Sequence, residues 1–219
     1  MKITAISNLG LCGGKKALKA KISRLCEAGI DEIVLRQKDL SVGEYEALFC
    51  EILQICDHFG VRLFLHNFLD LAYELNHKFI WLPLVVLQEN RHNLAKFEKI
   101  VISAHSADEA KTALNLGANA LCLSHIFPTD CKANLEPKGL DLIRNVREFW
   151  GGEIYALGGI NSSNFHFAIE SGADNIAIMS SAMTCENEKE FILNFLEKRL
   201  LDGRSVRLKL NGNFKGFID

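Results

Sequence analysis

Short, nearly continuous apolar runs recur along the chain, and amphipathic segments separate them. We expect buried strands at Ile3–Ser7, Glu32–Gln37, Arg62–His66, Phe79–Pro83, Ile100–Ala104, Ala120–Ile126, Ile154–Leu157 and Asn175–Ser180. Apolar stripes at helical spacing lie between them: Leu18, Ile22, Leu25 and Cys26; Leu48, Ile52, Ile55 and Phe59; and Phe191, Phe195, Leu196 and Leu200. The pattern predicts strands that alternate with helices.

One short sequence pattern is repeated three times, starting at Glu27, Asn115 and Glu170, and a looser fourth copy starts at His58. Each copy reads as a helix end, a glycine suited to the left-handed position after the helix, and a buried strand. Eight such strands without a linker predict a single parallel (β/α)₈ barrel over residues 1–201. A doubly wound open sheet is the alternative, but that fold does not require eight strands.

Capping residues mark several of the expected helix boundaries. Ser106 and Glu109 have the spacing of a capping box, and Asn161 or Ser162 can cap the helix that follows Gly158-Gly159-Ile160. We expect a short helix between Asn90 and Lys96. Beyond Leu201, alternating apolar and basic residues form a C-terminal tail, residues 202–219, to which we assign no role.

Composition narrows the classes of function. A net charge of −2 over 219 residues leaves no basic face for nucleic acid and no polybasic membrane anchor. The seven cysteines form no Cys-x-x-Cys pair, which is typical of reduced thiols in a cytosolic protein. The longest apolar run, Phe79–Leu87, contains Pro83 and is too short to cross a membrane. We therefore expect a cytoplasmic protein with neither membrane nor nucleic-acid partners.

Chemistry in such barrels collects at the C-terminal ends of the strands. The predicted strand ends carry polar or glycine residues: Arg36, Lys38, His66, Asn67, Ser103, His105, Ser124–Lys132, Gly158, Gly159, Ser180 and Ser181. Gly158 and Gly159 precede a helix, on the side where barrels often hold a phosphate, although a tight turn alone would also explain them. Arg36 and Lys38 project to one side and can meet a second anionic group, or they can be solvated at a strand end.

The segment from Ala120 to Lys132 changes from a buried strand to a turn within one residue. His125 stands at that change, and Thr129 and Lys132 follow it. An imidazole has an ordinary pKa of ~6.5 and can move protons near neutral pH, next to an anion held by a hydroxyl and an ammonium group. A hydrogen-bonded structural histidine is the alternative.

With these residues in place, the chain resembles the thiamine phosphate synthase and thiazole tautomerase superfamily over nearly its whole length. The matching segments are Leu35–Lys38, Ser103–Ala110, Phe127–Lys132, Ala156–Ile160 and Gly172–Ser180. The resemblance implies a thiazole phosphate substrate bound by Arg36, Lys38, Asn67, Ser103, Thr129, Lys132, Gly158, Gly159, Ser180 and Ser181. Barrels of this superfamily are commonly dimers, so it also implies a homodimer.

The two activities of the superfamily differ in whether they need a metal site. Synthases carry magnesium on an Asp after the Asn of strand three and on a second Asp after strand four. Here Asn67 is followed by Phe68, and Val86 stands in the second position. Neither side chain offers the oxygen ligands that magnesium needs. We therefore expect no metal site and no cofactor; magnesium would be needed only by a synthase.

The segment around His125 also resembles the tautomerase more than the synthase, which commonly has Gly-Pro in place of Ser124-His125. The resulting hypothesis is a thiazole tautomerase, an isomerase in which His125 acts as general acid and base. One alternative is a thiamine phosphate synthase, a transferase that joins a pyrimidine pyrophosphate to a thiazole phosphate and recruits magnesium through other carboxylates. A second alternative is a non-catalytic barrel that binds thiazole or thiamine phosphates.

Overall fold

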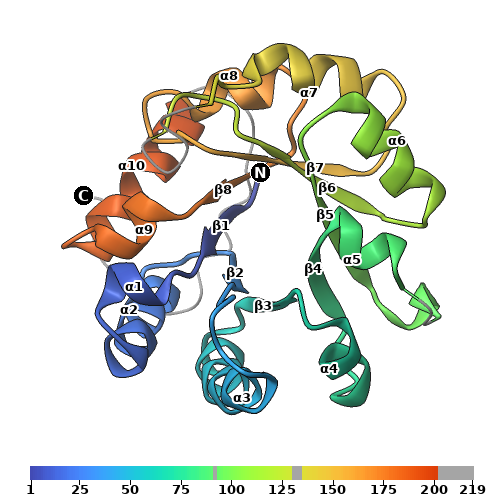
Figure 1. The fold of residues 1–219 in the computed structure, drawn as a ribbon. Helices are drawn as coiled ribbons and strands as arrows, with labels where there is room; N and C mark the ends of the chain where they lie inside the picture. Colours follow the sequence, from blue (N-terminus) through green and yellow to red (C-terminus); the bar gives the residue numbers. More distant parts are fainter. Residues whose placement is uncertain (91–92, 130–134, 202–219) are drawn as a thin grey trace.

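A computed structural model describes residues 1–90, 93–129 and 135–201, with side chains described as far as Lys198. Eight parallel strands form a closed barrel in the order of the sequence, and helices surround it (Figure 1). The strands are β1 Ile3–Ile6, β2 Glu32–Leu35, β3 Arg62–His66, β4 Phe79–Pro83, β5 Lys99–Ala104, β6 Ala120–Ser124, β7 Glu153–Leu157 and β8 Asn175–Ile178. This confirms the predicted single (β/α)₈ barrel.

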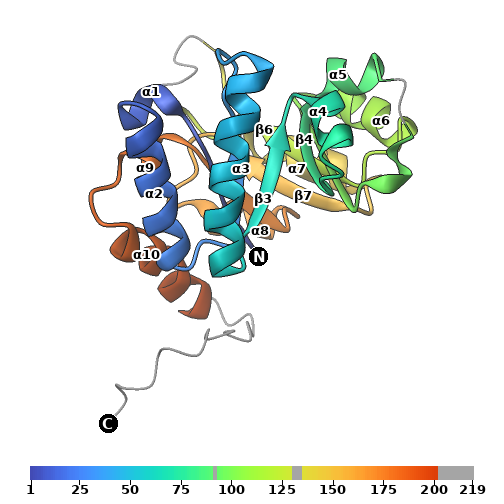
Figure 2. The same cartoon turned by 90° about the horizontal axis from the view of Figure 1, so that it is seen from below.

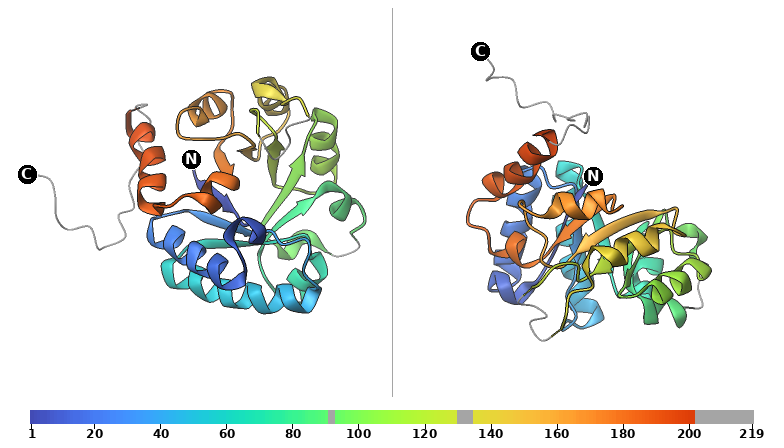
Figure 3. Two further views of the ribbon diagram at one scale, coloured as in Figure 1. Left: turned by 60° about the vertical axis from the view of Figure 1, so that its left-hand side comes forward. Right: turned by 90° about the horizontal axis from the view of Figure 1, so that it is seen from above.

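The helices pack their apolar faces against the outside of the strands. They are α1 Leu9–Cys12, α2 Lys15–Glu27, α3 Val42–Phe59, α4 Leu69–Glu74, α5 Leu84–Gln88, α6 Ala107–Asn115, α7 Gly139–Arg147, α8 Phe165–Glu170, α9 Ser180–Thr184 and α10 Glu188–Leu201. The long helices α2 and α3 lie side by side, and α10 packs against α2 (Figures 2 and 3). Together they bury a continuous core of aliphatic and aromatic side chains between helices and strands.

The four repeated segments have the expected local structure. Gly29, Gly60, Gly117 and Gly172 all have positive φ, between 67° and 113°, just after a helix. In each case a strand of the barrel follows within four residues. A residue with a Cβ is strained at such a φ, which explains why the pattern places glycine there.

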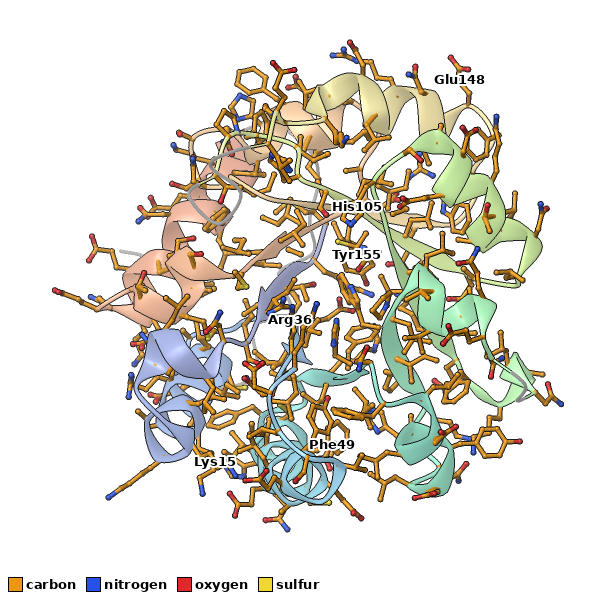
Figure 4. The ribbon with its side chains drawn as sticks, in the orientation of Figure 1. Lys15, Arg36, Phe49, His105, Glu148 and Tyr155 are labelled. Carbon is orange, nitrogen blue, oxygen red and sulfur yellow. The ribbon has the colours of Figure 1, made fainter. Side chains whose placement is uncertain are left out.

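Side chains that point into the barrel form layers along its axis. At the N-terminal ends of the strands, Glu32, Arg62, Lys99 and Glu153 form an ion-paired layer. Above it lies a separate apolar cluster of Ile6, Val34, Phe64, Trp81, Val101, Ala120, Cys122, Tyr155 and Ala177. Because side chains alternate along a strand, the inward positions above this cluster include Arg36 and His66. Figure 4 shows Arg36 and Tyr155 near the middle of the ring, whereas Lys15 and Glu148 lie at the periphery.

Some predicted helix boundaries are wrong. After β4, helix α5 begins directly at Leu84, and the described residues of the region expected to hold the fourth helix, 90 and 93–96, form no more than a 3₁₀ turn, Leu94–Lys96. Helix α8 begins at Phe165, because Asn161 instead accepts hydrogen bonds from the backbone N–H and hydroxyl of Ser163 and forms a turn. At α6 only half of the capping box is present: Ser106 caps the helix, but Glu109 accepts from the backbone N–H of His105.

Two further expectations concern composition. Among the residues that the structure describes, no helix combines the length and apolar character needed to cross a bilayer. No disulfide joins the described cysteines, which are Cys12, Cys26, Cys50, Cys56, Cys122 and Cys185. The C-terminal tail, residues 202–219, lies outside the described residues.

Candidate functional site

The cationic side of the barrel mouth follows β2. Ser7 fixes this loop, because its buried hydroxyl accepts hydrogen bonds from the backbone N–H of Arg36 (2.8 Å) and from Nε2 of Gln37 (2.9 Å). Neither the Arg36 nor the Lys38 side chain forms an ion pair with a described residue, so Lys38 is not neutralised by Asp39. Both border a cavity of about 530 Å³ that they share with the loop after β1. The arrangement leaves two positive charges available to an anion.

His66 ends β3 beside these cations. Its residue is only 6 % exposed, and its backbone N–H donates to the hydroxyl of Tyr45 at 2.9 Å. Burial lowers the pKa of His66 to about 3, and the positive charges of Arg36 and Lys38 act in the same direction. His66 is therefore a neutral imidazole at neutral pH. The apolar pattern marks His66 only as a strand-end residue, but its place in the alternation Arg62, Phe64, His66 is a signal that it faces inward.

The next residues decide whether magnesium fits. Asn67 has a φ of 72°, and Phe68 packs on the ring of Tyr45 with 4.5 Å between centroids. A second cavity of about 490 Å³ is bordered by Asn67, Phe68, Asp70, Val86 and Glu89, among others. Phe68 and Val86 contribute only apolar surface there. Among the described residues, no three His, Cys, Asp or Glu side chains gather into a possible metal site. The two positions that carry aspartates in the synthases thus offer no ligand, whereas Asp70 and Glu89 are the carboxylates on this cavity through which a synthase would have to recruit magnesium.

The end of β5 is held by contacts between strands. The hydroxyl of Ser103 accepts from the indole N–H of Trp81 at 3.3 Å, deep in the mouth. Nδ1 of His105 lies 2.8 Å from the backbone oxygen of Ser124 and 3.1 Å from its hydroxyl. These contacts join the end of β5 to β6, which is a structural role for His105.

His125 is more enclosed than a residue at an open mouth. It is 3 % exposed, and its Nε2 lies 3.2 Å from the backbone oxygen of Leu135. The chain after it continues along β7, where Ile126 and Phe127 donate to the backbone oxygens of Leu157 and Gly158 at 3.0 Å. His125 borders neither of the two cavities. The half-buried Thr129 follows, whereas Lys132 lies outside the described residues.

Gly158 and Gly159, which follow β7, leave room for the chain after β6. A Cβ on Gly158 would lie 2.3 Å from the Cβ of His125, and one on Gly159 would lie 2.4 Å from the backbone oxygen of Pro128. Both glycines also have positive φ, 95° and 67°. Close backbone approach is therefore sufficient to require glycine at both positions. The phosphate that sequence analysis expected there remains a prediction.

The mouth therefore has two sides. Arg36, Lys38, His66 and Asn67 follow β2 and β3, whereas His125, Gly158, Gly159, Ser180 and Ser181 follow β6, β7 and β8. Ser180 and Ser181 form the first turn of α9. In a closed ring of eight strands, β2 lies opposite β6.

Known proteins resemble this chain in sequence and in fold. A family model described as thiamine monophosphate synthase matches residues 3–182. A thiamine-phosphate synthase of Clostridium acetobutylicum is 26 % identical over 192 residues, covering 83 % of this chain and 90 % of the relative. One from Clostridium botulinum is 27 % identical over 184 residues, with the same coverage of each chain. These relatives agree with the synthase named as an alternative and not with the tautomerase.

Structural comparison supports the fold. A thiamine phosphate pyrophosphorylase from Pyrococcus furiosus superimposes with a TM-score of 0.77 at 23 % identity, covering 93 % of this chain and 97 % of the other. A second family model, described as a CdiA C-terminal tRNase toxin domain, matches residues 162–219. Residues 162–201 of that stretch include α8, β8, α9 and α10 of the same barrel, so the match does not mark a separate domain before the tail.

Proposed function

Because this chain belongs to the thiamine monophosphate synthase family, we propose that it is an enzyme of thiamine biosynthesis and that its reaction is thiazole tautomerisation. The observation that carries the choice is Phe68. In the position that would hold a magnesium ligand, an aromatic ring packs on Tyr45, and Val86, which borders the same cavity, offers no oxygen at the second position. Asp70 and Glu89 also border this cavity but stand at other positions. Without ligands at these two positions, a leaving pyrophosphate would depend on other carboxylates to hold the bridging divalent ion that stabilises its developing charge.

Tautomerisation needs no such ion. One proton leaves the ring carbon of a dihydrothiazole-ylidene carboxylate and another is added to the exocyclic carbon, so the ring becomes aromatic without net loss of atoms. His125 is the proposed general acid and base. Its Cβ packs against Gly158, beside the turn proposed to hold the substrate phosphate with Gly159, Ser180 and Ser181. The proposal includes the remaining expected binding residues Asn67, Ser103, Thr129 and Lys132, and the homodimer.

The enclosure of His125 sets a condition on this mechanism. Its Nε2 is engaged by the backbone oxygen of Leu135, so this nitrogen must exchange that partner for the substrate before it can move a proton. The same enclosure is the observation that favours a non-catalytic thiazole phosphate-binding protein. Such a protein would bind the substrate phosphate without turnover.

The deciding experiment follows conversion of the carboxythiazole phosphate tautomer, with excess magnesium and with a chelator. We expect the same turnover in both conditions. Loss of turnover with the chelator that magnesium restores would contradict the proposal. The relatives' names favour a synthase, so pyrimidine pyrophosphate and thiazole phosphate are tested in parallel. Efficient coupling without tautomerisation would replace the proposed reaction with the transferase, and binding without either reaction would favour the carrier.

A further inference from the structure

His66 is a buried imidazole that the proposed proton transfer does not use. It follows Phe64 of the inner apolar cluster by two positions, and it pairs in register with Trp81 of the same cluster. Residues in register on parallel strands point to the same face, so the ring of His66 points into the barrel. Because it is the last residue of β3, the ring lies at the C-terminal mouth.

Arg36 is its neighbour on the adjacent strand. The register pairs Val34 with Phe64 and Leu35 with Leu65, so the next position of β2 falls beside the next position of β3. The positive charges of Arg36 and then Lys38 both act on the imidazole. From α3, the other titratable group near His66 is the Tyr45 hydroxyl, which accepts from the backbone N–H and donates to the backbone oxygen of Leu35. Trp81, its neighbour on β4, does not titrate.

The backbone of His66 is thus fixed, but neither ring nitrogen has a hydrogen bond to any residue that the structure describes. Three other histidines, one buried and two partly buried, differ. Nε2 of His77 lies 2.9 Å from the backbone oxygen of Leu63, and His105 and His125 each meet a backbone oxygen. The residue is 6 % exposed, yet its ring nitrogens are not among the fully buried polar atoms without a partner, which within the described residues are limited to Nε1 of Trp150. A ring nitrogen of His66 is therefore open to a molecule in the mouth, where no described side chain competes for its hydrogen bond.

We propose that His66 and Arg36 form a subsite that binds an anionic oxygen group, and that this group is the carboxylate of the substrate. The assignment to a carboxylate rests on the proposed function, because β2 and β3 lie across the barrel from the proposed phosphate turn after β7. The neutral imidazole donates one N–H to a carboxylate oxygen, and the guanidinium holds the charge. His66 is therefore a positioning and specificity residue that orients the ring for proton transfer elsewhere.

The test uses binding and does not depend on turnover. The full chain is titrated calorimetrically with 4-methylthiazole-2-carboxylate, with its neutral carboxamide and with inorganic phosphate. We compare His66→Leu, which removes both ring nitrogens, with His66→Gln, which keeps an N–H donor. His77→Gln is the matched control, because burial also lowers the pKa of His77 although its ring has a protein partner. Ring resonances of His66 report contact directly in the parent protein.

We expect His66→Leu to weaken carboxylate binding about tenfold or more, as for a hydrogen bond to a charged group, and His66→Gln to recover most of it. Carboxamide and phosphate binding should change little, and the His66 ring resonances should shift on saturation with the carboxylate. The subsite is wrong if the parent does not bind the carboxylate, if His66→Leu binds it as tightly as the parent, or if those resonances do not move. A loss confined to phosphate binding would instead place the phosphate group here.

These outcomes are separate from those of the proposed function. Tautomer turnover together with carboxylate binding that is independent of His66 would overturn only the subsite. Carboxylate binding that depends on His66, without turnover of the tautomer, would overturn only the proposed reaction. Circular dichroism and melting temperatures show whether His66→Leu folds; if it does not, His66→Gln and the resonance shifts still decide the question.

Discussion

Nε2 of His125 lies 3.2 Å from the backbone oxygen of Leu135, across the loop that joins β6 to α7. At this distance the contact is a long hydrogen bond in which the imidazole donates. If Nε2 exchanged the Leu135 oxygen for a substrate atom, it could take part in proton transfer. Loss of the hydrogen bond to Leu135 should leave the packed strands in place. The contact therefore lets the catalytic and the structural role of His125 be tested separately.

We expect His125→Asn to lower the single-turnover rate of tautomerisation by about 10²–10⁴-fold, because general acid–base catalysis typically contributes that much. Asn can still donate a hydrogen bond to the loop, so the melting temperature should change little. His105→Asn is the control, since His105 joins β5 to β6 through Ser124. A folded His125→Asn variant with the parent rate, next to an inactive but folded His105→Asn, would move the proton carrier to β5.

The second prediction concerns the proposed phosphate turn. In amide NMR spectra, inorganic phosphate should shift the backbone signals of Gly159 and Ser181, where a glycine turn and the first turn of α9 present N–H groups at the same end of the barrel. Signals near Lys2 and Arg62, at the opposite end, serve as the internal control. Shifts confined to that opposite end would overturn the assignment of the phosphate site.

The third prediction follows from the lowered pKa of His66. In the unfolded chain an imidazole takes up a proton below pH ~6.5, whereas in the fold it does so only near pH 3. Stability is therefore lost as pH falls below ~6.5, by about 2 kcal/mol between pH 7 and pH 5 from this group alone. Urea denaturation should show that His66→Gln loses less stability over this range than the parent. If the parent and His66→Gln lost the same stability between pH 7 and pH 5, His66 would take up its proton in the folded protein over that range.

The fourth prediction concerns the ion-paired layer at the other end of the barrel. The carboxylate of Glu32, only 1 % exposed, meets Arg62 at 2.7 Å and Lys2 at 3.2 Å, and accepts from Thr4 and Tyr155. We expect Glu32→Ala to cost about 3–5 kcal/mol in the free energy of unfolding, because it leaves buried donors and a cation without their partner.

Glu51→Ala is the matched control, since Glu51 pairs with Lys19 at an exposed position and should contribute less than about 1 kcal/mol. Ligand binding at the mouth should be preserved in both variants at temperatures where they are folded. A destabilisation by Glu32→Ala no larger than that of Glu51→Ala would show that the layer is dispensable.

The sequence by itself determined the barrel and the location of its mouth. Each strand is encoded by a local apolar run, and each glycine after a repeated helix has the left-handed φ that its place implied. These features depend on neighbours within a few residues, so periodicity and glycine placement were sufficient to predict them. The same count placed Arg36, His125 and Gly158 near strand ends, although β1, β2, β6 and β8 end one or two residues earlier than predicted.

Only the tertiary structure decided what those residues contact. The loop after His125 pairs with β7, which is distant in sequence, and this pairing encloses the imidazole. The close approach of His125 also requires glycine at position 158, whether or not a phosphate binds there. Likewise, the register of β2 and β3 sets Arg36 beside His66, and burial makes that imidazole neutral. Register, burial and electric field each depend on groups far apart in the sequence, so no local pattern contains them.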